Sequence, residues 1–215
     1  MRLRLRPLLW IIGLLAAAAL ATAAEPRLIL SKKFPRSVPD FVELRITPDG
    51  QVEFREKPDE DPLLLHLTTA EAQSVFDAAK RCDNFRRPLE SGLKVAFMGD
   101  KLFRWEDGDE HHEVHFNFTQ DLDGQAMLDW YERIVESIEL RLDLERTARY
   151  DPLGVNQALL QLEAAYDNKR LIAKEQYLPM LDRVAKNEKY MRMARERAAR
   201  LADTIRGVQP PKADQ

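Results

Sequence analysis

KVAFMGDKLFRWEDGDEHHEVHFNFT, residues Lys94–Thr119, is the stretch of sequence that decides the fold. Its last segment alternates apolar and polar side chains from His112 to Phe118, and successive side chains of a strand point to opposite faces of a sheet. Two glycine-containing turns, Gly99-Asp100 and Asp107-Gly108-Asp109, divide the stretch. It therefore predicts three short antiparallel strands with one face in a core and the other in water.

Signals for further strands and a helix precede this stretch. Phe41–Ile46 and Gln51–Glu56 alternate in the same way, and Thr47-Pro48-Asp49-Gly50 between them has the composition of a tight turn. Leu63–Leu67 predicts a short strand. Thr68 and Glu71 form a capping box, which opens a predicted helix that runs to about Cys82. Residues 25–40 contain three prolines and predict an extended lead-in at an edge of the sheet.

The composition becomes helical after Thr119. Apolar residues recur at spacings of 3, 4 and 7 from Met127 to Leu142, which predicts a long amphipathic helix ending near Tyr150. The Pro-Gly break at 151–154 ends it, and two or three helices follow. The fold class expected is α+β: an antiparallel sheet of about five strands, one short and one long packing helix, and a C-terminal helical hairpin or small bundle. The domains expected are an α+β domain over 25–125, a helical region over 126–206 and a disordered tail over 207–215.

Residues 1–24 have the composition of a secretory signal peptide. Three arginines precede an apolar run from Leu8 to Leu20, and Ala21-Thr22-Ala23 has the small-x-small form of a cleavage site. The apolar run is shorter than the roughly 20 residues of a spanning helix. We therefore expect export to the periplasm or beyond and no transmembrane helix after cleavage; an uncleaved membrane anchor is the alternative.

Charge is unevenly distributed along the chain. Residues 25–118 contain 14 Lys and Arg against 19 Asp and Glu, whereas residues 186–206 contain 7 against 3. One basic helix is not the basic domain of a nucleic-acid-binding protein, so nucleic acid is not an expected partner. The single cysteine, Cys82, excludes an internal disulfide and follows the apolar face of the first predicted helix, where we expect it to be buried.

The histidine cluster at 111–115 is the one constellation that suggests a metal site. His111 and His115 lie four residues apart on a strand, about 13 Å, which is too far for both to reach one ion. Glu113 and His115 are the nearest candidates, and they need a third ligand from elsewhere in the chain. We expect no bound metal, no cofactor and no assignable catalytic residue.

The last predicted helix carries a basic stripe. Its members are Lys189, Arg192, Arg195 and Arg200, interleaved with two glutamates. One interpretation is a solvated helix face with pairs at i, i+4. The other is contact with an acidic protein surface or with anionic lipid head groups, which makes these four residues the candidate partner-binding site.

Two resemblances bear on function. Residues 41–118 resemble uncharacterised secreted bacterial α+β domains, for which no activity is assigned. Residues 178–205 are similar to one HEAT-type helix pair, a repeat that serves as a protein-binding scaffold. We expect an exported, non-enzymatic binding or envelope-interaction module. The alternatives are a hydrolase or metal-dependent enzyme with a site assembled from non-local residues, or a protein inhibitor of a secreted enzyme.

Overall fold

The computed structural model describes residues 25–208. The predicted signal peptide and nearly all of the predicted tail lie outside this range. The chain forms an antiparallel six-stranded sheet with five α-helices, which confirms the α+β class. The strands are β1 (Arg27–Lys33), β2 (Phe41–Ile46), β3 (Gln51–Arg55), β4 (Leu63–His66), β5 (Asp100–Asp107) and β6 (Glu110–Phe116). The helices are α1 (Thr69–Arg81), α2 (Leu122–Tyr150), α3 (Val155–Asp167), α4 (Leu178–Lys186) and α5 (Arg192–Arg206).

The strand order across the sheet is β4-β3-β2-β1-β5-β6. β1 is central: Leu30 lies opposite Leu44 on one side and Phe103 on the other. The expectation that residues 25–40 follow an edge was therefore wrong. The prolines of residues 25–40 lie before and after β1, where they remove no hydrogen bond from the sheet.

The expectation of a strand over 94–98 was also wrong. That segment was expected to pair with β5, but β1 occupies this side of β5. The pairing of β1 with β5 runs from Arg27 opposite Glu106 to Lys33 opposite Asp100. Residues 92–99 instead form an irregular loop. The two remaining strands of the quoted stretch, β5 and β6, form the predicted hairpin, with Asp107 opposite Glu110 across the turn.

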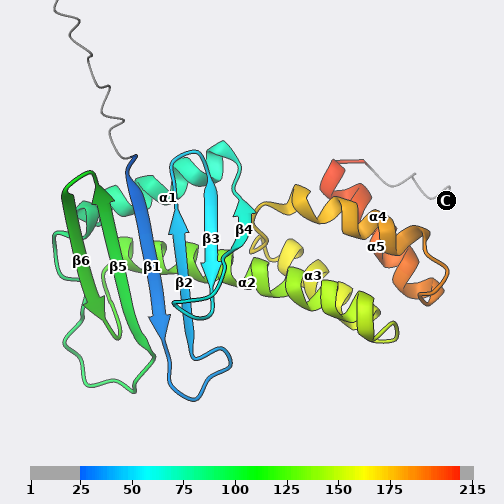
Figure 1. Ribbon diagram of the computed structural model, residues 1–215, viewed down its shortest axis with the longest axis horizontal. Helices are drawn as coiled ribbons and strands as arrows, with labels where there is room; N and C mark the ends of the chain where they lie inside the picture. The colour runs from blue at the N-terminus through cyan, green and yellow to red at the C-terminus, as the bar shows by residue number, and fades with distance from the viewer. Residues whose placement is uncertain (1–24, 209–215) are drawn as a thin grey trace, which may run out of the picture.

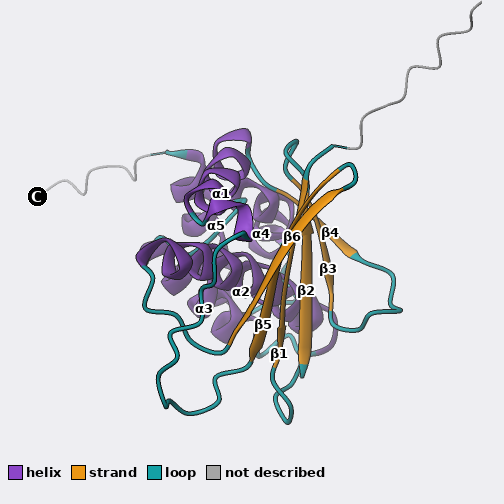
Figure 2. Cartoon of the chain, turned by 90° about the vertical axis from the view of Figure 1, so that its left-hand side faces the viewer, coloured by secondary structure: helices purple, strands orange, loops and turns teal. Residues whose placement is uncertain are grey.

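Helices cover one face of the sheet and leave the other open (Figure 2). The covered face and the inner sides of α1 and α2 form the first core, which includes Leu30, Phe103, Phe116 and Tyr131. At its start, α1 has the predicted capping box, in which Thr68 Oγ1 accepts from the Glu71 amide and the Glu71 carboxylate accepts from the Thr68 amide. Local sequence thus determines where α1 begins.

A second core lies beyond the sheet, among the C-terminal helices (Figure 1). Leu144 of α2 packs there with Leu159, Leu181 and Leu201 of the next helices. The 29 residues of α2 span about 43 Å, so one helix can belong to both cores. α4 and α5 form a helix pair with the bend at Asn187, where the sequence predicted it.

The start of α2 is fixed by an ion pair that gives a pH prediction. Asp121 caps the helix by accepting from the Gly124 amide at 2.8 Å, and it binds the Arg87 guanidinium through both oxygens at 2.6 and 2.9 Å. The Arg87 hydrogen bond and then the Gly124 amide lower the pKa of Asp121 to about 2. Because the folded pKa is lower than the unfolded one, the stabilisation is present above about pH 4 and is lost as the pH falls toward 2.

Asp121→Asn keeps a capping oxygen and removes the charge. We expect it to lower the free energy of unfolding at pH 7 by less than about 1 kcal/mol, because the pair is partly exposed. We also expect the free energy of unfolding of the variant to fall less steeply between pH 4 and 2 than that of the unmodified chain, as measured by urea unfolding across that range. An unchanged acid dependence in the variant would exclude this pair as a source of the acid sensitivity.

Cys82 ends α1 with its side chain buried, and burial raises the pKa of its thiol to about 11. Because only the thiolate reacts with thiol reagents, we expect native labelling to be at least tenfold slower than labelling in denaturant. Stopped-flow absorbance with a chromogenic disulfide reagent measures the labelling rate in the native state and in denaturant. Equal rates would mean that the thiol is accessible in the folded protein.

Candidate functional site

The two residues considered as metal ligands lie on β6, on the open face of the sheet. Glu113 accepts a hydrogen bond from Arg104 Nε at 2.8 Å, and its other oxygen lies 3.9 Å from His115 Nε2. The ring of His115 also lies 3.7 Å from Asp100. In the part of the chain that the structure describes, no three His, Cys, Asp or Glu side chains are placed to hold a metal ion. Glu113 and His115 thus lie near each other, but Glu113 already has an arginine partner.

The basic stripe lies on α5 and the turn before it. Arg192 pairs with Glu196 at 2.8 Å, as expected for an i, i+4 pair on a solvated face. Arg195 is half-buried, and Lys189 and Arg200 are exposed. The stripe therefore presents fewer free charges than its sequence suggests, and its role in partner binding stays a prediction.

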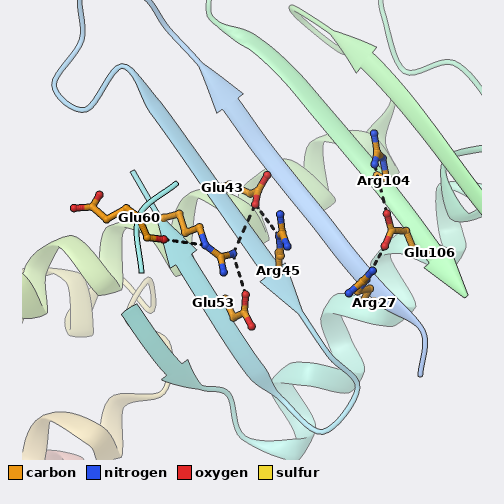
Figure 3. A network of polar contacts seen from close by, with 8 residues as sticks. Arg27, Glu43, Arg45, Glu53, Glu60, Arg104 and Glu106 are labelled. Atoms are coloured by element: carbon orange, nitrogen blue, oxygen red, sulfur yellow. Dashed lines mark hydrogen bonds and ion pairs between the residues drawn. The ribbon is translucent and has the colours of Figure 1, made fainter. Parts of the chain in front are cut away.

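The open face of the sheet is covered by pairs of opposite charge (Figure 3). Arg45 contacts Glu43 at 2.8 Å, and the same glutamate lies 3.9 Å from Arg55. On β5, the side chain of Glu106 contacts Arg27 of the neighbouring β1 at 2.6 Å and Arg104 of its own strand at 3.4 Å. Because these charges neutralise one another across the strands, this face has little net charge with which to attract a charged partner.

The largest group of exposed apolar side chains lies at one end of the sheet. It comes from two loops, residues 34–40 between β1 and β2 and residues 92–99 before β5, which lie at the same end of the strands (Figure 1). Their exposed apolar members are Phe34, Val38, Leu93, Val95, Phe97 and Met98. We call these two loops and their side chains the sheet-end surface.

The two loops of the sheet-end surface contact each other. The rings of Phe34 and Phe97 pack with centroids 5.8 Å apart. Even so, Phe97 remains 54% exposed, and Val38 is fully exposed. Scattered single apolar residues are ordinary on a protein surface, but a grouped patch of this kind marks a contact site for a protein or a membrane.

The backbone of loop 92–99 is held by two polar side chains, the buried Lys101 and the half-buried Asn117. Lys101 is only 3% exposed, and its ammonium group donates to the carbonyl oxygens of Met98, Gly99 and Asn117 at 3.2, 3.0 and 2.7 Å. The Asn117 side chain accepts from the Met98 amide at 2.6 Å and donates to the Ala96 carbonyl at 3.0 Å. Burial lowers the pKa of Lys101, a cost offset by three carbonyl partners.

A carboxylate holds the other end of the same loop. Glu90 accepts from the Asn117 amide at 2.6 Å and from the Gly92 amide at 3.3 Å, and these backbone hydrogen bonds lower its pKa. The loop is thus tied to the hairpin at several points, while Leu93, Val95 and Phe97 project into solvent. Such a backbone presents apolar side chains without the entropic cost of ordering the loop on binding.

Positive charge surrounds this surface. Residues 32–40 and 92–99 contain four cations, Lys32, Lys33, Arg36 and Lys94, against one carboxylate, Asp40. The Lys32 ammonium lies 5.7 Å from the centroid of the Phe34 ring. The two loops of the sheet-end surface have a net charge of +1, and Lys32 and Lys33 at the end of β1 raise the local net charge to +3, although residues 25–118 as a whole are acidic.

Sequence reasoning missed this surface because it took 94–98 for a strand. The usable signal was an apolar run without a carboxylate, LKVAFM, between Gly92 and Gly99. The ties to Lys101 and Asn117 connect side chains to backbone groups across the loop and have no local sequence pattern.

Comparison with known protein families finds no matching family, and comparison with curated proteins finds no matching sequence. In the described part of the chain, no helix is both long and apolar enough to cross a membrane.

Proposed function

We propose that the protein is an exported, non-enzymatic envelope-interaction module whose sheet-end surface docks on anionic lipid. The observation that carries this proposal is the loop 92–99, whose backbone is tied by Lys101 and Asn117 while its apolar side chains face solvent. Apolar side chains enter the boundary between head groups and acyl chains, and nearby cations are attracted to anionic head groups.

The shape of the molecule supports shallow docking by the loops alone. Both loops extend past the ends of the helices, so they can touch a flat surface before the rest of the chain does (Figure 2). A cavity of about 370 Å³ beside loop 34–40 has Glu132, Glu136 and Glu139 on its α2 side. These carboxylates oppose deeper approach to an anionic surface.

The predicted signal peptide is compatible with docking by the sheet-end surface. β1 runs from Arg27 toward the sheet-end surface and is seven residues long, so Arg27 lies about 20 Å from that surface. Cleavage of the leader leaves the sheet-end surface free to face a membrane of the envelope. N-terminal sequencing of the exported protein tests cleavage, and a start at Met1 would favour the anchored alternative.

Vesicle sedimentation tests the proposed function. The mature chain is expected to sediment with phosphatidylglycerol-containing vesicles and not with pure phosphatidylcholine vesicles, and added salt is expected to weaken binding by screening the cations. Failure to bind the anionic vesicles at low salt would contradict the proposal and favour a protein partner for the same surface.

The stripe on α5 supplies a competing site in the same assay. Arg192→Glu, Arg195→Glu and Arg200→Glu change charges in the helical region, away from the sheet-end loops (Figure 1). Sheet-end docking predicts that this triple variant keeps most of its vesicle binding and folds normally. Loss of binding in this variant would move the docking site to α5.

A further inference from the structure

A groove of about 540 Å³ lies between the second half of α2 and α4. Three arginines line it: Arg141 and Arg149 from α2, and Arg183 from α4. The only carboxylate among the residues that line it is Glu145. The groove therefore gathers a net charge of +2 from two helices that are separate in sequence.

The arginines of this groove are not all engaged within the chain. Arg141 pairs with Glu145 at 3.0 Å. The guanidinium of Arg149 lies 5.8 Å from the centroid of the Tyr150 ring. Over residues 25–208, neither Arg149 nor Arg183 forms an ion pair. Two guanidinium groups thus remain free for an anion, and their planar forks suit oxyanions.

The walls of the groove supply little other polar recognition. The Tyr190 hydroxyl already donates to the Ala148 carbonyl at 2.8 Å, and the Gln176 side chain donates to the His66 carbonyl. Met180 and Val184 add apolar surface from α4. A ligand can therefore place its charged end on the arginines and a small apolar body against α4.

We propose that this groove binds the phosphate monoester group of a small molecule. A phosphate monoester carries nearly two negative charges near pH 7, which matches the net +2 of the groove. The first turn of α4, at Pro179 and Met180, also lines the groove. The volume exceeds that of phosphate alone and leaves room for the remainder of the molecule.

This site is independent of the sheet-end surface, because its residues belong to the second core and the helices around it. The same phosphate monoester could come from a molecule in solution or from a lipid head group such as that of phosphatidic acid. The test therefore needs a soluble arm and a vesicle arm.

Isothermal titration of the mature chain with glycerol phosphate, at low ionic strength, is the soluble arm. The pair Arg149→Gln and Arg183→Gln is expected to lower affinity at least about tenfold, since it removes two charge-assisted contacts. The matched control is Arg146→Gln with Arg206→Gln, two exposed arginines that lie outside both the groove and the basic stripe. Thermal melts establish that each variant folds.

The vesicle arm uses phosphatidylcholine vesicles with and without phosphatidic acid, in a Leu93→Ser, Phe97→Ser background that lacks the proposed loop docking. Binding that depends on Arg149 and Arg183 supports the site. If glycerol phosphate binds, the ligand is a soluble phosphate monoester; if only phosphatidic acid binds, the ligand is a lipid head group. No binding in either arm, equal affinity in the groove and control variants, or equally tight binding of citrate would overturn the assignment to a phosphate monoester.

Discussion

Replacing Leu93 and Phe97 by serine is expected to weaken binding to anionic vesicles by about 10- to 100-fold. Both side chains are about half exposed in the free protein, at 50% and 54%. Full burial of such a side chain contributes about 1.5–3 kcal/mol, so burying the exposed half of both contributes about the same amount in total. Each 1.4 kcal/mol changes the equilibrium constant tenfold.

The fold should tolerate this change. Phe97 has one aromatic neighbour, Phe34, and is 54% exposed. The matched control is Leu153→Ser with Leu160→Ser, which removes two exposed leucines from the helical region. If both double variants bind alike, or if neither differs from the unmodified chain, the loop side chains do not enter the membrane.

Lys101→Met is expected to release loop 92–99 from the hairpin. The change removes one ammonium group and leaves the carbonyl oxygens of Met98, Gly99 and Asn117 without that donor. The hydrogen bond to Gly99 is buried, and a buried acceptor left unsatisfied costs about 1–3 kcal/mol, part of which is regained because a buried charge is removed. We expect a lower melting temperature, faster chymotryptic cleavage at Phe97, and vesicle binding weakened about fivefold or more because the loop must then be ordered on docking.

Lys33→Met separates the loop tie from the loss of one positive charge. Lys33 is exposed near the same surface, and no hydrogen bond joins its ammonium group to loop 92–99 in the described structure. It should therefore lose only the attraction of one cation, about 1 kcal/mol near an anionic surface, with no change in cleavage. A Lys101→Met protein that resists cleavage as well as the Lys33→Met protein would show that Lys101 does not hold the loop.

Features encoded by neighbouring residues were predictable from the sequence. The Thr47–Gly50 turn lies between β2 and β3, and Gly50 takes the left-handed conformation at φ +95°. There an added Cβ would lie 2.6 Å from the Leu67 carbonyl oxygen. The capping box of α1 and the apolar spacing of α2 likewise depend on residues within a few positions.

Features that depend on distant partners were not predictable in the same way. Leu30 is central because Leu44 and Phe103 pair with it on both sides, and nothing near residues 27–33 specifies those partners. Loop 92–99 has the alternation of a strand, but the position it was expected to take is occupied by β1. The sheet-end surface was missed for that reason, because it exists only where this loop meets loop 34–40.

Depth-dependent quenching at residue 97 tests the central claim most directly. A fluorophore is attached to Phe97→Cys in a Cys82→Ala background, and a second protein carries it at Leu153→Cys in the helical region. With anionic vesicles that contain acyl-chain quenchers, we expect strong quenching at position 97 and almost none at 153. Quenching at 153 alone, or at neither position while the protein sediments with the vesicles, would contradict docking by the sheet-end surface.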